Sequence, residues 1–301
     1  MNKFLIVVAG PTAVGKTSLS ISLARHFNTE IISADSRQFY KELSIGTAKP
    51  SVQELKEIKH HFIDSISITE GYTVAEFEKE AINCINNIFS RKDVVILTGG
   101  SGLFIDAVCK GFDNLPETDK EIRSALQLIL EKDGIKKLQK KLKDLDPLYY
   151  DKIDLNNPHR LIRAIEVCLI SGKAYSSFLN NSKPIVRGFK TIKIVLNIGR
   201  QELYERIDLR VDEMMQSGLL NEVKGLQSQL HLNALNTVGY KEFKDYFNEN
   251  SPLEETIKSI KQNSRRYAKR QLTWFRKDKE YEWFDPAEKD KIIAYIQAKI
   301  S

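Results

Sequence analysis

The segment from Gly10 to Thr17 constrains the fold of this chain more than any other feature. Its sequence, GPTAVGKT, fits the phosphate-binding pattern G-x-x-x-x-G-K-[ST] at every fixed position. Residues 4–9 form a short apolar run typical of a buried parallel strand, and residues 17–27 carry apolar side chains at helical spacing. A strand, loop and helix in this order surround an anion with backbone N–H groups and the positive end of a helix. The loop residues expected to bind diphosphate are Gly10, Pro11, Thr12, Ala13, Val14, Gly15, Lys16 and Thr17.

Two side chains of this loop carry specific chemistry. The Lys16 ammonium is expected to meet the outer phosphate oxygens, and the Thr17 hydroxyl to hold a Mg²⁺ ion that bridges them. The alternative is a glycine-rich turn that binds nothing. The strand before the loop and the helix after it favour the phosphate site.

Composition limits the class of protein further. The chain has 301 residues, of which 42% are hydrophobic and 29% charged, and no stretch approaches the roughly 20 apolar residues of a membrane span. The first strand begins at once, so we expect no signal peptide and a cytoplasmic location. The three cysteines form no C-x-x-C pair and indicate neither a disulfide framework nor a zinc site. The net charge of +6 favours an anionic partner.

A carboxylate follows the second predicted strand. Residues 30–34 are typical of a strand, and Asp35 comes directly after it. Ligands of open α/β sheets bind beyond the carboxyl ends of the strands, so Asp35 is expected in the same crevice as Lys16. It could accept a proton, hold a substrate amine or hydroxyl, or lie near the metal. The alternative is an aspartate that caps the next helix.

A glycine-rich turn follows another buried strand, residues 93–98. Nucleoside triphosphatases often place an acidic residue there for Mg²⁺, whereas this chain continues with GGSGLF over residues 99–104. The glycines permit tight turns and close backbone approach. Ser101 could donate a hydrogen bond to a phosphate or leaving-group oxygen. A solvated serine in a glycine turn is the alternative.

Helical periodicity dominates beyond Gly111. Residues 119–132, 135–145 and 158–171 are predicted helices, and a strand is expected again at 191–198. We therefore predict an α/β fold with a P-loop NTPase-like parallel sheet core over residues 1–111 and 191–301. An all-helical insertion domain is predicted over residues 112–190.

Basic residues in two of the predicted helices allow two interpretations each. Arg160 and Arg163 are three residues apart and share a helix face, which suits either a phosphate clamp or a solvated surface. Residues 257–279 interleave nine basic side chains with Tyr267, Trp274 and Phe275. This mixture is typical of RNA binding, and a solvated basic helix is the alternative.

Taken in order, these segments resemble the tRNA dimethylallyltransferase family, also called isopentenyl-diphosphate:tRNA transferases. The resemblance covers nearly the whole chain and rests on GPTAVGKT, IISADSRQFY, IGTAKP, GGSGLF, NPHRLIRAIEV, RVDEMMQSGLLNEV and VGYKEF. The family transfers a dimethylallyl group from dimethylallyl diphosphate to N6 of the adenosine immediately 3′ of the anticodon in a subset of tRNAs, with Mg²⁺. Where the family usually has GGTGLY, this chain has Ser101 and Phe104. Serine keeps the hydroxyl but loses a methyl group, so the role is expected to survive with looser positioning.

The resemblance implies a role for each matching residue. Asp35 would bind the adenine N6 and receive its proton, and Ser101 would contact the oxygen between the allyl carbon and the diphosphate. Lys16, Thr17 and Mg²⁺ would stabilise the released charge. Arg210 would contact the diphosphate, with an internal salt bridge as the alternative. The positions implied to contact tRNA are Asp35, Ser36, Arg37, Gln38, Ser101, Arg123, His159, Arg160, Leu161, Ile162, Arg163, Gly239, Tyr240 and Lys241.

The implied partner is a tRNA anticodon stem-loop whose target base leaves the stack to reach the site. We expect a bacterial-type enzyme, since the chain lacks the zinc-finger extension of some eukaryotic relatives, and we expect a monomer. Three other functions remain open at this point: a small-molecule kinase with the same phosphate loop, an isopentenyltransferase acting on free adenine nucleotides, and an RNA-binding protein without catalysis.

Overall fold

The computed structural model describes residues 2–111, 115–179 and 186–301. The chain divides into two compact units, one comprising Met1–Cys109 with Arg187–Ser301 and the other Lys110–Val186. The sequence predicts a helical insertion domain over residues 112–190. Its first residue, 112, lies outside the described residues. No helix in the described part of the chain is both long and apolar enough to cross a membrane.

The first unit is built on a six-stranded sheet in the order β3-β2-β4-β1-β5-β6, and every strand pair is parallel. Its strands are β1 (Phe4–Ala9), β2 (Ile31–Ser33), β3 (His60–His61), β4 (Val94–Gly99), β5 (Lys190–Leu196) and β6 (Glu282–Phe284). Because β1 lies between β4 and β5, the strand order reverses beside the phosphate loop, where open sheets bind their ligands. The predicted α/β class with a parallel sheet is confirmed.

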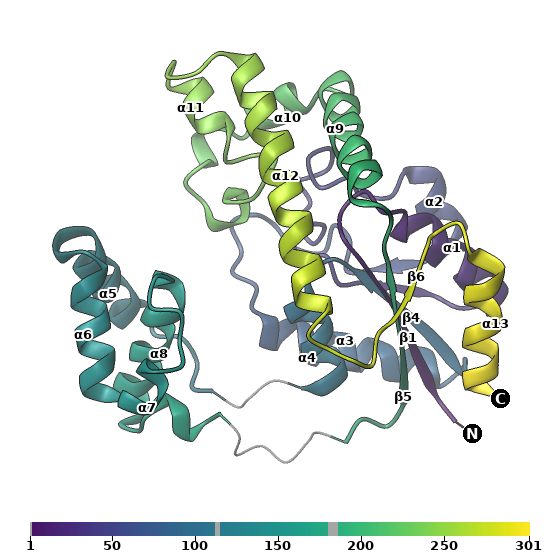
Figure 1. Cartoon of the computed structure of the whole chain (residues 1–301), viewed down its shortest axis with the longest axis horizontal. Helices are drawn as coiled ribbons and strands as arrows, with labels where there is room; N and C mark the ends of the chain where they lie inside the picture. Colours follow the sequence, from purple (N-terminus) through teal and green to yellow (C-terminus); the bar gives the residue numbers. More distant parts are fainter. Residues whose placement is uncertain (1, 112–114, 180–185) are drawn as a thin grey trace. The chain divides into compact units, whose positions relative to one another are not determined.

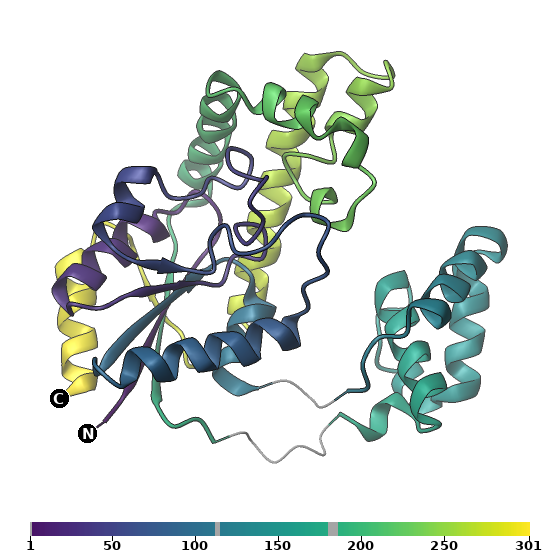
Figure 2. The same ribbon diagram turned by 180° about the vertical axis from the view of Figure 1, so that it is seen from behind.

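Helices cover both faces of this sheet (Figure 1 and Figure 2). The helices of the first unit are α1 (Lys16–His26), α2 (Val52–Glu57), α3 (Val74–Phe89), α4 (Gly102–Lys110), α9 (Arg200–Gln216), α10 (Leu219–Gly225), α11 (Phe243–Phe247), α12 (Leu253–Phe275) and α13 (Lys289–Ile300). Alternate residues of β1 face opposite layers: Phe4, Ile6 and Val8 join a buried cluster with α1 and α13, whereas Leu5, Val7 and Ala9 join one with α3 and α4. Burial on both faces explains why this strand is apolar throughout.

A third apolar cluster joins α9, α10, α11 and α12 (Figure 1). Val211, Val223, Phe243 and Ile260 pack in it with Tyr40 from the segment after β2. This packing holds α9 and α12 against the loops that follow the strands.

Local capping explains where several elements begin. Thr73 and Glu76 form a capping box at the start of α3. Strand β3 is short and comprises only His60–His61. Phe62 and Asp64 adopt φ values of 62° and 52°, and this left-handed backbone ends the strand.

The second unit consists of α5 (Lys120–Asp133), α6 (Ile135–Leu145), α7 (Pro147–Tyr150), α8 (Pro158–Ser171) and a 3₁₀ helix, η1 (Tyr175–Ser177). No strand occurs within residues 115–179, the described part of this unit between residues 111 and 186. Leu126, Leu138, Leu142 and Ile165 form its own apolar core.

Candidate active site

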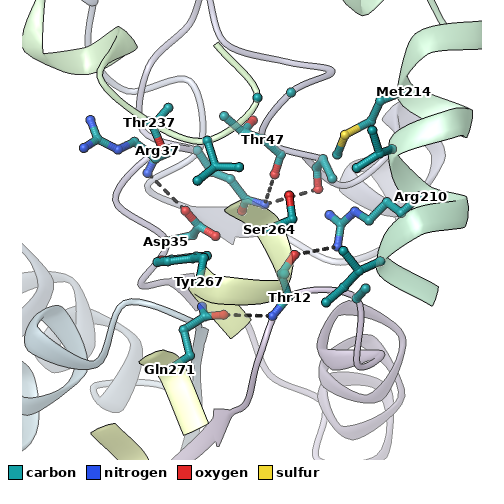
Figure 3. A pocket seen from close by; sticks show the side chains of 18 of the residues that line it. Thr12, Asp35, Arg37, Thr47, Arg210, Met214, Thr237, Ser264, Tyr267 and Gln271 are labelled. Carbon is teal, nitrogen blue, oxygen red and sulfur yellow. Dashed lines mark hydrogen bonds between the residues drawn. The ribbon is translucent and has the colours of Figure 1, made fainter. Parts of the chain in front are cut away.

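The first unit contains a cavity of about 690 Å³ beyond the carboxyl ends of β1 and β2 (Figure 3). Its walls come from the phosphate loop, the segment after β2, residues 46–48, helix α9, residues 236–241 and helix α12. Residues separated by more than 250 positions in the sequence therefore share one site.

The phosphate loop adopts a backbone that its glycines permit. Gly10 and Gly15 have φ values of 150° and 100°, and Ala13 between them has 63°. A Cβ at Gly10 would lie 2.8 Å from the carbonyl oxygen of Leu196, so only glycine fits there. Residues 12–17 line the cavity. Gly10 and Pro11 are not among the lining residues, and their expected contact with diphosphate stays a prediction.

Lys16 interacts with two other charged residues of this cavity, Asp35 and Arg210. Its Nζ donates hydrogen bonds to the carbonyl oxygens of Gly10 at 3.0 Å and Pro11 at 2.6 Å. Burial lowers the pKa of Lys16 to about 8, the negative charge of Asp35 opposes this shift, and the positive charge of Arg210 adds to it. A dianionic ligand would relieve the repulsion between the two cations.

Arg210 extends from α9 to the phosphate loop, where its Nη1 donates a hydrogen bond to Thr12 Oγ1 at 3.3 Å. Burial lowers the pKa of Arg210, and the charges of Asp35 and Glu213 oppose this effect. Arg210 forms no salt bridge with any residue that the structure describes. The hydrogen bond to Thr12 holds its guanidinium at the phosphate loop, where the charges of Asp35 and Glu213 attract it.

Asp35 through Gln38 all line the cavity. One oxygen of Asp35 accepts the N–H of Arg37 at 3.1 Å, so the carboxylate both caps a turn and faces the cavity. The guanidinium of Arg37 donates to the carbonyl of Ala234 at 3.1 Å, and the amide of Gln38 donates to the carbonyl of Thr47 at 3.3 Å. These two side chains hold neighbouring loops around the site.

Ser101 lies beside the cavity wall and is not among the lining residues. Its Oγ accepts the N–H of Ser36 at 3.2 Å and donates to the Ser36 hydroxyl at 3.3 Å. A side-chain hydrogen bond also links Ser101 with Tyr267. Both neighbours line the cavity, so Ser101 supports the loop that carries Asp35; its expected contact with the leaving group stays a prediction.

The glycines around Ser101 serve the close backbone approach expected from the sequence. None of Gly99, Gly100 and Gly102 has a positive φ. An added Cβ would lie 2.4 Å from the Ala34 carbonyl oxygen at Gly99, and 2.1 Å from Gln271 Nε2 at Gly100. These positions let β2 and α12 approach the turn.

Helix α12 contributes Gln271, which no sequence pattern singled out, together with Tyr267 and Arg270 from its basic and aromatic stretch. Burial and the charge of Asp35 raise the pKa of Tyr267 to about 12, so the phenol is neutral at pH 7. Ile260 and Ser264 line the cavity from the same helix. Their spacing of three to four residues is the signal that could have identified this face.

Several basic residues of α12, expected to contact RNA, have partners within the protein. Lys258, Lys261 and Arg265 pair with Glu255, Asp212 and Asp208. Of the interleaved aromatic residues, Phe275 is fully buried in the core and the Trp274 indole donates to Asp106 at 2.8 Å. Phe275 therefore fills the core, because its ring has no exposed surface.

The segment 239–241, expected to contact RNA, contains both cavity-lining and buried residues. Gly239 and Lys241 line the cavity, whereas Tyr240 is fully buried. The Tyr240 hydroxyl donates to Glu222 at 2.6 Å. The Tyr240 side chain therefore packs in the core, and the expected contact of this position with tRNA stays a prediction.

In the helical unit, the residues matching the tRNA-binding motif play different structural roles. Leu161 and Ile162 are core residues, which excludes side-chain contact with RNA in this arrangement. Arg163 donates to the fully buried Glu166 at 2.8 Å, and Arg123 lies 3.4 Å from the same carboxylate. His159 and Arg160 are exposed.

The cavity has oxygen donors suited to Mg²⁺ but no protein cage for it. Among residues 2–111, 115–179 and 186–301, no three His, Cys, Asp or Glu side chains are grouped to hold a metal. Thr17 and Asp35 both line the cavity. Mg²⁺ commonly binds through one or two protein oxygens together with phosphate and water, and these residues fit that mode.

Comparisons with known proteins agree over nearly the whole chain. The family model described as IPP transferase matches residues 38–278. The tRNA dimethylallyltransferase of Christiangramia forsetii is 54% identical over 302 residues, covering 100% of both chains. The solved tRNA isopentenylpyrophosphate transferase of Bacillus halodurans has a TM-score of 0.73 and 37% identity, covering 99% of this chain and 97% of that one. A solved eukaryotic dimethylallyltransferase acting on tRNA has a TM-score of 0.77 and 32% identity, covering 91% of this chain and 70% of that one.

Proposed function

Because the chain belongs to the IPP transferase family, we propose that it transfers a dimethylallyl group from dimethylallyl diphosphate to a tRNA, at N6 of the adenosine immediately 3′ of the anticodon. It is an enzyme, a tRNA dimethylallyltransferase of the prenyltransferase type. The observation that carries the finer proposal is that a phosphate loop and the Asp35 carboxylate line one cavity.

The phosphate loop is the proposed site of the diphosphate. Lys16 and Arg210 supply positive charge there, and the backbone of residues 12–17 supplies N–H donors at the start of α1. Thr17 would hold Mg²⁺, which supplies further neutralisation of the diphosphate charge when bound. These groups stabilise the charge that appears on diphosphate as it leaves.

The Asp35 carboxylate is the proposed acceptor of the N6 proton. In the transfer, the lone pair of N6 forms a bond to C1 of the allyl group, the C1–O bond breaks, and its electron pair remains with diphosphate. The proton of N6 moves to Asp35, which orients the weakly nucleophilic amine. Ser101 supports this geometry through its two hydrogen bonds with Ser36.

The tRNA is the proposed source of the adenine. An adenine in a stacked anticodon loop must be extruded to enter a cavity of this kind. Exposed His159 and Arg160 of the helical unit are proposed to contact the RNA backbone. A cytoplasmic location and a monomeric state complete the proposal.

One experiment tests this function against its alternatives. The protein is incubated with Mg²⁺, labelled dimethylallyl diphosphate and either bulk tRNA or AMP, and digested RNA is analysed for N6-modified adenosine. We expect label in tRNA, no label in AMP, and a loss of about 100-fold or more in rate for Asp35→Ala. As a matched control, Asp93→Ala changes an exposed carboxylate that pairs with Lys3.

The alternative outcomes are distinct. ATP consumption without label transfer would indicate the small-molecule kinase, which the comparisons do not favour. Label in AMP alone would indicate a transferase for free adenine nucleotides. Unchanged labelling by Asp35→Ala would contradict the role of this carboxylate.

A further inference from the structure

Gln271 joins two segments of the active site that are far apart in the sequence. It lies on α12 with 6% of its surface exposed. Its Oε1 accepts the N–H of Thr12 in the phosphate loop at 3.0 Å, and its Nε2 donates to the carbonyl of Gly100 after β4 at 2.9 Å. Figure 3 shows the bond to Thr12, and Thr12 in turn is bonded to Arg210.

We propose that Gln271 is a positioning residue for the diphosphate site, which orients the phosphate loop and, through Thr12, the guanidinium of Arg210. The inference rests on the proposed function, in which this loop holds the diphosphate. A neutral amide suits the position because it offers one acceptor and one donor to two backbone groups of opposite kind. The Gly100 carbonyl would otherwise be left without this partner in a buried region.

The chemistry of the amide explains why similar residues would not replace it. Glutamate cannot donate to the Gly100 carbonyl and would place a negative charge beside the anion site. Asparagine is one methylene shorter and cannot span both partners. Alanine would release the loop without adding charge, so Gln271→Ala is the cleanest test.

The hydrogen bond between Gln271 and Gly100 can also be broken by a substitution at Gly100. A Cβ at Gly100 would lie 2.1 Å from Gln271 Nε2, whereas the next atoms are Gln271 Cδ at 3.3 Å and the Gly10 carbonyl at 3.5 Å. Because the clashing atom is the end of a flexible side chain, Gly100→Ala should displace the amide and disturb little else. The two substitutions therefore act on one interaction.

The test measures affinity for inorganic pyrophosphate with Mg²⁺ by calorimetry, in the full chain. We expect Gln271→Ala and Gly100→Ala each to weaken pyrophosphate binding about tenfold, because a misplaced loop loses preorganised donors. The double variant should bind as weakly as Gln271→Ala alone, since the shared interaction is already absent. Gln262→Ala, an exposed glutamine on the same helix, is the control and should bind normally.

Affinity for an anticodon stem-loop RNA and urea denaturation separate positioning from loss of fold. Positioning predicts weakened pyrophosphate binding and a raised KM for dimethylallyl diphosphate, with RNA affinity unchanged. Retained pyrophosphate affinity in either single variant, additive losses in the double variant, or equal losses of RNA and pyrophosphate affinity would overturn the inference. If the unaltered protein fails to bind pyrophosphate, the proposed function of the loop fails instead.

Discussion

The Tyr240 hydroxyl donates a hydrogen bond to the Glu222 carboxylate at 2.6 Å. The same carboxylate accepts the backbone N–H groups of Ser44, Ile45 and Gly46, the last of which lines the cavity. Helix α10 thus holds a cavity loop through one side chain. Tyr240 belongs to this support rather than to a surface that RNA could reach.

Replacing Glu222 should therefore cost stability. Glu222→Ala leaves four donors without their acceptor, and we expect the free energy of unfolding to fall by about 2 kcal/mol. Tyr240→Phe removes only one of these bonds and should cost about 1 kcal/mol. Urea denaturation measures both. A Tyr240→Phe variant of unchanged stability but weaker tRNA binding would show that the hydroxyl contacts RNA.

The lowered pKa of Lys16 predicts an alkaline limit to activity. With a pKa of about 8, well below the ordinary value of 10.5, Lys16 is charged below pH 8 and becomes neutral above it. Since kcat/KM reports the free enzyme, kcat/KM for dimethylallyl diphosphate should fall as pH rises through about 8. Lys16→Arg keeps its charge, so its kcat/KM, although lower, should not show this fall. Parallel pH profiles for the two proteins would contradict the assignment.

The same shift has a defined effect on stability. The unfolded chain holds the Lys16 proton to a higher pH than the folded protein does. The unfolding free energy should therefore rise between about pH 8 and 10.5 by a contribution that Lys16→Met lacks. Denaturation of both proteins at the two ends of this range measures the difference.

Gly99→Ala should destabilise the protein at the carboxyl end of β4, beside the active site. Its Cβ would lie 2.4 Å from the Ala34 carbonyl oxygen, which is backbone and cannot move aside cheaply. We expect a loss of about 1–3 kcal/mol in unfolding free energy, typical of overpacking. Gly71→Ala is the control, because nothing lies within 4 Å of its Cβ. Equal stabilities for the two variants would exclude a packing role for Gly99.

Replacing Arg160 and Arg163 by alanine should have different effects, one on RNA binding and the other on stability. Arg163→Ala breaks a pair with the buried Glu166 and should cost about 3 kcal/mol of unfolding free energy. Arg160→Ala should leave stability unchanged and weaken binding of an anticodon stem-loop RNA. The slope of log K for that binding against log salt concentration should decrease by about 1, as expected for the loss of one phosphate contact. Unaltered RNA affinity in Arg160→Ala would remove it from the proposed interface.

Local sequence patterns determined much of this protein. The phosphate loop between an apolar strand and a helix predicted the site of β1 and α1, and Asn157 and Gly172 lie at the two ends of the predicted helix α8. These features depend on residues that are close together in the sequence, so a short segment is enough to predict them. Asp35 could likewise be assigned to the cavity, because parallel strands present their carboxyl ends at one edge.

Only the tertiary structure decided which side chains of the later helices reach that cavity. Tyr240 and Arg160 are both polar residues of motifs that suggested RNA contact, yet one is buried against Glu222 and the other exposed. Gln271 meets Thr12 across 259 residues, a contact that no local pattern predicts. Burial and hydrogen-bond partners depend on the packing of distant segments, and these decide whether a polar side chain binds a ligand or supports the fold.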